Sequence, residues 1–208
     1  YNNTLAIRGI LTKSPEKIDN KNIALFLGSD FHHVIYPVSS SRDLNFIAII
    51  KHQLSEEEQK NHTLFNNNLF IRKVLEKLPL RNKGFLDDLK ELKIFPVFVS
   101  DNFFRLQNNN IHFIGDAFFA FPPSFAQGAS QSIEGAYELF KSIENNTENI
   151  FFKKRVNKIK MVNFRSKLNQ FVFHLSNPLT TFARNILLKR LVKNKKFLES
   201  YLGKIYRN

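Results

Sequence analysis

The sequence predicts an α+β fold, in which an antiparallel sheet is followed by helices. Four short stretches rich in apolar and β-branched residues follow one another at close spacing within the first 50 residues. Beyond residue 128, longer segments carry apolar residues at partly helical spacing. The segment between these regions, IHFIGDAFFAFPPSFAQGAS over residues 111–130, is typical of a strand, a Gly-Asp turn, a Pro-rich loop and a helix start.

The predicted sheet comes first and should have one covered face. Turn residues separate its apolar stretches, most clearly Ser39-Ser40-Ser41-Arg42. Strands joined by such short turns pair in an antiparallel arrangement. Four strands are expected, at Thr4–Leu11, Asn22–Gly28, Phe31–Val38 and Asp43–Ile50.

Helices and further strands should follow the sheet. Ser55 with Glu58 three residues later forms a capping-box pattern, which predicts a helix running to about Asn61. Apolar spacing predicts two more helices, at Leu64–Leu78 and Gly84–Leu92. The chain then returns to strand at Phe95–Val99, Phe103–Leu106 and Ile111–Ile114. Helices are expected again at Ile150–Leu175, Pro178–Val192 and Lys196–Leu202.

The corner between Gly115 and Gly128 carries the strongest functional signal. Gly115 leaves room for a close approach to the backbone, and Asp116 offers two acceptor oxygens for the hydroxyl groups of a ligand. Pro122 and Pro123 stiffen the loop that leads to the helix at Gly128. The free N–H groups and the dipole of that helix start favour negative charge. The combination suits a flavin, because the reduced ring is negative near N1.

The helix that begins at Gly128 is expected to have one apolar face. Its apolar residues recur at helical spacing. They are Ile133, Ala136, Leu139 and Phe140.

These residues resemble the Gly-Asp…Pro…Gln-Gly signature of FAD-dependent aromatic-ring monooxygenases, the relatives of salicylate hydroxylase, 6-hydroxynicotinate 3-monooxygenase and the ubiquinone-biosynthesis hydroxylases. The resemblance implies that Asp116, after Gly115, binds the ribityl chain of FAD. It also implies that Pro123 and the loop to Gln127 pass beside the isoalloxazine ring.

The resemblance assigns further positions around the helix start. The N–H groups of Gln127, Gly128 and Ala129 would stabilise negative charge on N1 and the C2 carbonyl oxygen, and Glu134 matches an acidic position in the helix. One feature departs from the family pattern, which reads Gly-Asp-Ala-Ala-His. Here Phe118 and Phe119 follow Ala117, which indicates a more apolar pocket.

The family's dinucleotide-binding turn has no counterpart in the sequence. None of the seven glycines forms a G-x-G-x-x-G motif, which such a βαβ unit requires. By the resemblance, the chain is expected to be the carboxyl-terminal portion of a longer enzyme that lacks the N-terminal Rossmann unit, and to bind FAD poorly alone. Three regions are expected: substrate-binding sheet and helices at 1–100, part of an α/β FAD-binding fold at 101–148, and basic helices at 149–208.

Three residues of the predicted sheet are candidate substrate contacts. His32 and Tyr36 lie four apart on one strand, so their side chains share a face. Their spacing is similar to that of pocket residues in the salicylate and hydroxynicotinate hydroxylases, where such a His could accept a phenol proton. Arg8, before Gly9, resembles an Arg-Gly element that could pair with a substrate carboxylate or with the carbonyl edge of the flavin. The alternatives are a hydrogen-bonded pair on a half-buried sheet and a surface arginine.

The resemblance implies a reaction as well as a site. NADH or NADPH would reduce FAD, and O2 would supply the oxygen transferred to an aromatic or phenolic substrate, with Pro123, His32 and Tyr36 nearest the chemistry. Two alternatives stay open. One is another flavoprotein of the superfamily, a halogenase or an isoprenoid-lipid reductase. The other is a non-catalytic basic protein of the membrane surface.

Composition and charge complete the prediction. The absence of Cys excludes disulfides, and together with the lack of long apolar runs it favours a cytoplasmic protein. No metal site is expected. Residues 151–208 contain 15 Lys and Arg and one acidic residue, Glu199, giving +14, whereas residues 1–150 sum to −1. The basic block is either a solvated helix surface or a peripheral contact with anionic lipid, and no nucleic acid is expected.

Overall fold

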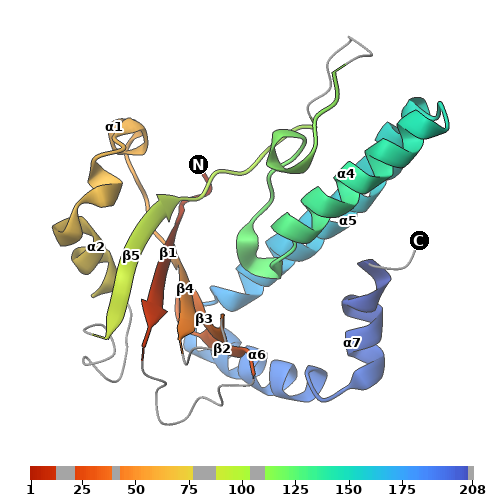
Figure 1. Cartoon of the computed structure of the whole chain (residues 1–208). Helices are drawn as coiled ribbons and strands as arrows, with labels where there is room; N and C mark the ends of the chain where they lie inside the picture. Colours follow the sequence, from red (N-terminus) through yellow and green to blue (C-terminus); the bar gives the residue numbers. More distant parts are fainter. Residues whose placement is uncertain (13–21, 39–42, 77–87, 104–110, 206–208) are drawn as a thin grey trace. The chain divides into compact units, whose positions relative to one another are not determined.

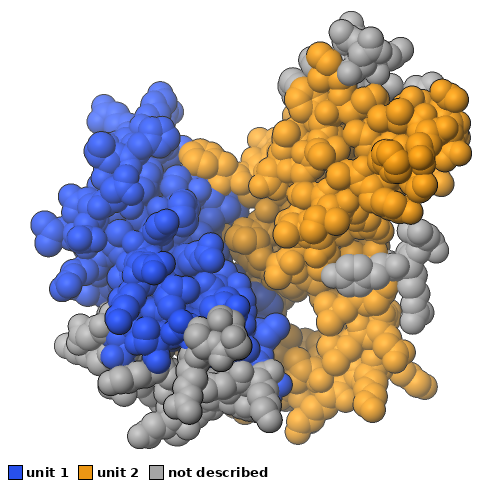
Figure 2. Space-filling view, in the orientation of Figure 1, with its two compact units in different colours: residues 1–97, 173–177 blue, residues 98–172, 178–208 orange. Residues whose placement is uncertain are grey.

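The computed structural model describes residues 1–12, 22–38, 43–76, 88–103 and 111–205. The chain divides into two compact units, coloured separately in Figure 2. Unit 1 comprises Tyr1–Val97 together with Phe173–Asn177, and unit 2 comprises Phe98–Val172 together with Pro178–Asn208. Each unit therefore includes segments that are distant in the sequence.

Unit 1 is built on a five-stranded sheet with the order β2-β3-β4-β1-β5 (Figure 1). All four strand pairs are antiparallel, as the sequence predicts. The bounds of the first four strands agree with the predicted ones to within two residues. The strands are β1 (Thr4–Leu11), β2 (Ala24–Leu27), β3 (Phe31–Pro37), β4 (Leu44–Lys51) and β5 (Leu89–Pro96).

One face of this sheet carries the hydrophobic core of unit 1. Alternate residues of the strands point to it and pack with the short helices that follow β4. These helices are α1 (Glu56–Lys60), a 3₁₀ turn at Leu64–Asn66 and α2 (Asn68–Leu75). The core residues include Leu5, Ile7, Leu11, Ile35, Leu44, Phe46, Ile50, Ile71, Val74, Leu75 and Ile94.

The predicted capping box opens α1. The Ser55 hydroxyl accepts a hydrogen bond from the Glu58 N–H at 3.1 Å, and the Ser55 N–H donates to the Glu58 carboxylate at 2.8 Å. The two contacts satisfy backbone donors that a helix start otherwise leaves unpaired. Of the second predicted helix, α2 forms the larger part, whereas its last two residues, Lys77 and Leu78, lie outside the described residues.

The predicted helix at Gly84–Leu92 is wrong over its described part, because β5 begins at Leu89. The error comes from Leu89 and Leu92, whose spacing of three is typical of a helix. Both side chains nevertheless approach Gly9 of β1, since a Cβ built there would lie 3.2 Å from a methyl carbon of each. Residues 84–87 lie outside the described residues.

A β-bulge explains how residues three apart share one face of a strand. Arg8 pairs with Lys93 and Ile10 pairs with Lys90, so β5 has one more residue than β1 between the two pairs. Glu91 lies at this point with a φ of 52°. The additional residue shifts the alternation of side chains by one, which produces a helix-like spacing in a strand.

Unit 2 contains the segment around the Gly-Asp pair and the helices that follow. Two 3₁₀ turns, Gly115–Ala117 and Pro123–Phe125, lead into α4, which begins at Gly128 as predicted. In Figure 1, α4 runs alongside α5. The helices are α4 (Gly128–Glu144), α5 (Glu148–Phe173), α6 (Pro178–Leu191) and α7 (Lys195–Tyr201), with a last 3₁₀ turn at Gly203–Ile205.

The strand predicted at Ile111–Ile114 does not form. Ile114 has extended dihedrals, with φ −133° and ψ 164°, but the segment pairs with no strand among the described residues. An extended segment becomes a strand only when a neighbouring backbone supplies its hydrogen bonds. Of the strand predicted at Phe103–Leu106, Phe103 is irregular and the other residues lie outside the described ranges.

The side of α4 that is buried also differs from the prediction. The expected apolar face is open, since Ile133 is 72% exposed and Phe140 is 53% exposed. Instead, Gln131, Gly135 and Ser142 are buried, at spacings of four and seven residues. Polar and small residues replace apolar ones there because α4 packs against a buried arginine of α5, described below.

Candidate functional site

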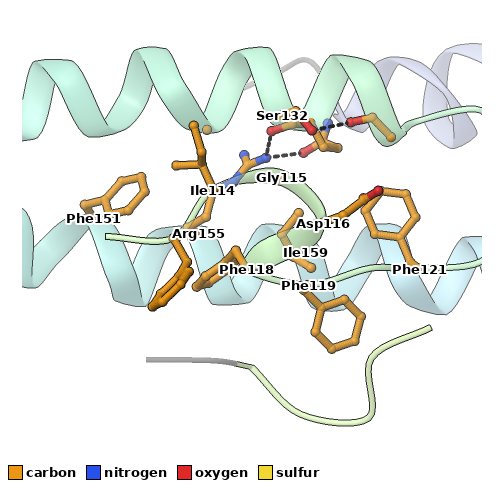
Figure 3. A pocket seen from close by; sticks show the side chains of 14 residues that line it. Ile114, Gly115, Asp116, Phe118, Phe119, Phe121, Ser132, Phe151, Arg155 and Ile159 are labelled. Atoms are coloured by element: carbon orange, nitrogen blue, oxygen red, sulfur yellow. Dashed lines mark hydrogen bonds between the residues drawn. The ribbon is translucent and has the colours of Figure 1, made fainter. Parts of the chain in front are cut away.

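The turn at Gly115 requires glycine for two independent reasons. Its φ is +58°, in the left-handed region that other residues rarely adopt. In addition, a Cβ at this position would lie 2.7 Å from the Ser132 Oγ on α4. The backbone of the turn is therefore held directly against the first turns of α4, as Figure 3 shows.

The predicted cofactor contacts lie around this turn. The side chain of Asp116 is exposed, and its carboxylate has no hydrogen-bond or ion-pair partner among the described residues. Pro123 and Ala129 are exposed, and Gly128 is partly exposed. Gln127, at the N-cap position of α4, is buried, and its side chain makes no capping hydrogen bond within the described part of the chain. An exposed carboxylate and a helix start without a side-chain cap thus occur within one short segment.

Phe118 and Phe119 point away from this surface into the interior of unit 2. They are 5% and 3% exposed and pack in a cluster with Ile159 of α5. Phe103 adds ring contacts to both, at centroid distances of 5.5 and 4.6 Å. The two rings therefore fill the space beneath the Gly115 turn and leave the side of Asp116 open.

A small internal pocket lies between the turn, α4 and α5. Figure 3 shows Gly115, Ser132, Arg155 and Ile159 among the residues that surround it. Its volume is about 10 Å³, which is room for about one water molecule. A three-ring ligand does not fit there, so a flavin would have to lie on the outer surface of the corner.

The Pro123–Phe125 turn is fixed by α5 and α7. The Asn169 Nδ2 of α5 donates to the backbone carbonyl of Ser124 at 3.2 Å, and the Tyr201 hydroxyl of α7 donates to the Asn169 Oδ1 at 2.7 Å. The ring of Tyr201 also meets Phe125 edge-on at 5.6 Å. These contacts fix the position of the proline-containing loop against α5 and α7.

Arg155 joins α4 to α5 and was not recognised in the sequence. Its side chain is 4% exposed and forms ion pairs with Glu138 at 3.3 Å and Glu134 at 3.7 Å. It also donates to the backbone and side-chain oxygens of Gln131. Glu134, which matches an acidic position in the helix of the family, additionally pairs with Lys158. An arginine among many lysines in a basic helix gives no sequence signal of burial.

In unit 1, the predicted substrate contacts share the face of the sheet opposite the core. Strand alternation and register place Arg8, His32 and Tyr36 there. Asn45 of β4 lies on the same face, directly opposite Tyr36, and is 0% exposed. Arg8 Nε donates to Asn45 Oδ1 at 3.3 Å.

Asn45 is a polar residue of this face that sequence reasoning missed. Because Arg8 can only donate, the amide oxygen must face it, and this fixes the direction of Nδ2. That buried Nδ2 has no hydrogen-bond partner among the described residues. The signal was present in the sequence, since a lone asparagine interrupts the apolar stretch LNFIAII of residues 44–50.

His32 is buried and makes contact with the segment that follows α5. It is 3% exposed, its Nδ1 lies 2.9 Å from His174 Nε2, and its ring meets Phe173 edge-on at 5.1 Å. Burial lowers the pKa of His32 to about 3, with further contributions from His174 and His33. His32 is therefore neutral at pH 7 and a weaker base than an ordinary histidine, whose pKa is 6.5.

His33 points to the core face instead and has a different environment. Its ring stacks on Phe26 at 4.5 Å, and burial lowers its pKa to about 4. Among the described residues, no group of three or more His, Asp or Glu lies close enough together to hold a metal ion.

Comparison with solved structures identifies the fold. The chain is similar to Klebsiella pneumoniae HpxO complexed with FAD and uric acid, with a TM-score of 0.75, 13% identity, and coverage of 99% of this chain and 53% of that one. A salicylate hydroxylase substrate complex gives 0.62 and 17%, covering 91% of this chain and 53% of that one. The tetracycline destructase Tet(51) gives 0.57 and 10%, with 90% and 52% covered.

The predicted resemblance to FAD-dependent aromatic hydroxylases is thus confirmed at the level of the fold, over nearly the whole chain. The chain spans about half the length of these proteins. The sequence matches no protein-family model and no curated protein.

Proposed function

We propose that this chain is the flavin- and substrate-contacting part of an FAD-dependent monooxygenase that hydroxylates an aromatic substrate. The observation that carries the proposal is the Gly115 corner. Its glycine is required by backbone geometry and by contact with Ser132, and it precedes an exposed Asp116 that the described part of the fold leaves without a partner. Such a residue is available for a ligand, and the similar structures include complexes with FAD.

The residues of the corner fit part of FAD. The Asp116 carboxylate would accept hydrogen bonds from the ribityl hydroxyl groups. The N–H groups at Gly128 and Ala129 would face the negative edge of the reduced ring, and Pro123 would lie beside it. When bound, the flavin would supply the transfer of oxygen from O2, with NADH or NADPH as electron donor. Without a G-x-G-x-x-G turn in these 208 residues, the adenine half of FAD requires another segment.

The polar face of the unit 1 sheet supports an aromatic substrate that carries a carboxylate or an ionised ring oxygen. Arg8 and the Asn45 Nδ2, which is unpaired among the described residues, are both hydrogen-bond donors, and Tyr36 can donate its hydroxyl proton. We assign His32 a hydrogen-bonding role, because a pKa of about 3 makes it a poor acceptor of a phenol proton at neutral pH.

Flavin titration tests the proposal directly. FMN and FAD would be titrated with the 208-residue chain while the fluorescence anisotropy of the ring is followed. Because FMN contains only the ring, the ribityl chain and one phosphate, we expect it to bind nearly as well as FAD. Asp116→Ala should weaken binding by about 10- to 100-fold, which corresponds to a lost charge-assisted hydrogen bond of about 1.5–3 kcal/mol.

A matched control separates this role from a general effect of charge. Asp101 is also an exposed carboxylate in unit 2, and Asp101→Ala should leave the affinity unchanged. The proposal is refuted if both aspartate variants bind flavin as the original chain does.

A further inference from the structure

The helix α6 has apolar residues on two opposite sides. Leu188 and Leu191 are partly buried on the side where Arg184 is buried. On the other side, four large apolar side chains are exposed to solvent. They are Leu179 (80%), Phe182 (68%), Ile186 (39%) and Leu187 (55%).

The spacing of these four residues makes one continuous face. Positions i, i+3, i+7 and i+8 of an α-helix fall on a single stripe, so Leu179, Phe182, Ile186 and Leu187 form what we call the outer face of α6. A helix that is apolar on both sides is normally covered on both. In the described part of the chain, however, the outer face is open to solvent.

The segment of the chain that contains the outer face is strongly cationic. Residues 149–198 contain 13 Lys and Arg and no acidic residue. Lys189 and Arg190 occupy the last turn of α6, Lys193 lies between α6 and α7, and Lys195 and Lys196 begin α7; all five are exposed. Within the described ranges, none of these five takes part in an ion pair.

We propose that the outer face of α6 docks on an anionic membrane surface. Apolar side chains at this spacing can enter the boundary between headgroups and acyl chains, while neighbouring Lys and Arg side chains reach the lipid phosphates. No helix within the described residues is long and apolar enough to cross a membrane, so the contact is one of a helix lying in the interface.

Charge complementarity favours lipid over a second copy of the chain and over a nucleic acid. A second copy of the chain would bring the cations of two α6 helices close together without any acidic residue between them. A nucleic acid would meet the cations but would offer no apolar layer to the outer face. An anionic bilayer provides both the negative charge and the apolar layer.

Vesicle binding with a single introduced fluorophore tests this inference. Because the chain has no Trp, Phe182→Trp places one indole in the outer face. On adding vesicles of ~30% phosphatidylserine in phosphatidylcholine, we expect its emission to shift to the blue and to be quenched by brominated acyl chains. Pure phosphatidylcholine should give at least about tenfold weaker binding. Phe140→Trp, in the exposed face of α4, should show neither change.

Paired substitutions separate apolar insertion from attraction of charge alone. Phe182→Ser with Leu187→Ser should reduce co-sedimentation with the anionic vesicles at least about tenfold. The matched pair Ile133→Ser with Phe140→Ser removes two comparably large exposed apolar residues from α4 and should have no effect. Circular dichroism would verify that each variant keeps its helices.

Three results would overturn the inference. The first is an absence of binding to the anionic vesicles. The second is binding that is lost in the variant Lys189→Gln with Arg190→Gln but kept in the variant Phe182→Ser with Leu187→Ser. This result would indicate attraction of charge alone. The third is a stable dimer in which the introduced tryptophan is already shielded without lipid, which would assign the outer face to a second copy.

Discussion

At the scale of single residues, two features of the candidate sites do not stabilise the fold. Gly115 adopts a φ of +58° next to Ser132, and the amide nitrogen of Asn45 is buried without a partner among the described residues. The unpaired amide nitrogen costs stability, and both features occur where we propose that a ligand binds. Polar groups left unsatisfied by the protein are the ones that a ligand can satisfy.

Asn45 provides a test of this exchange between stability and binding. In Asn45→Leu, a side chain of similar size replaces the amide, and the exposed Arg8 can turn to water. We therefore expect the free energy of unfolding in urea to stay the same or rise by about 1 kcal/mol. The affinity for salicylate, measured by NMR titration of the chain, should fall about tenfold.

Thr4→Val is the matched control for this substitution. Thr4 lies on the same face of the sheet and also has a buried oxygen without a partner in the described part of the chain, but it is not in contact with Arg8. The variant should change stability as little as Asn45→Leu does and leave salicylate binding unaltered. Equal losses of affinity in both variants would show that the amide has no specific role.

At the scale of elements, the packing of α4 on α5 depends on Arg155. The guanidinium is buried among Gln131, Glu134 and Glu138, and a Cβ at Gly135 would lie 3.0 Å from its Nε. The Gly115 turn rests on the same part of α4 through Ser132. The arginine therefore supports the helix against which the candidate flavin corner is built.

We expect Arg155→Met to lower the free energy of unfolding by about 2–3 kcal/mol, because it leaves buried oxygens of α4 without their donor. Lys153→Met removes an exposed charge from the same helix and should change stability by about 0.5 kcal/mol or less. Urea unfolding followed by far-ultraviolet circular dichroism measures both. Similar losses in the two variants would mean that the α4–α5 contact does not need the arginine.

Sequence patterns predicted elements well where local rules decide them and poorly where distant residues do. The strand β1 and the capping box of α1 follow from alternation and from a four-residue motif. The strand β5 was missed because its bulge at Glu91 forms only against β1. The exposed face of α4 was missed because the position of Arg155, 24 residues after Gln131, decides which side is buried.

The candidate site could likewise be predicted only where its residues are close together in the sequence. The corner at Gly115 and Asp116 lies in one continuous stretch, so a motif could reveal it. No motif reveals the roles of Asn45 and His174, although Asn45 stands out as a lone asparagine in an apolar stretch. Their importance depends on Arg8, 37 residues away, and on His32, 142 residues away.

At the scale of the whole molecule, the chain leaves one unit and returns to it. Residues 173–177 belong to unit 1, although the helical segments on both sides of them belong to unit 2. Phe173 and His174 thereby cover His32 of β3. The environment of a residue in the first sheet is thus completed by a segment near the other end of the sequence.

The titration of His32 should show whether residues 173–177 shield its side chain. Its pKa of about 3 lies below the ordinary value of 6.5, so between these two pH values the unfolded chain binds more protons than the folded one. Stability should therefore fall as the pH decreases from 6.5 toward 3, by about 1.4 kcal/mol per pH unit from this group.

A fragment of residues 1–97 retains the sheet core but lacks Phe173 and His174. With less burial and no neighbouring His174, its His32 should titrate at a pH closer to 6.5. NMR of the imidazole protons would follow the titration of His32 in the fragment and in the full chain. Identical curves for His32 in the fragment and in the full chain would show that residues 173–177 do not shield it.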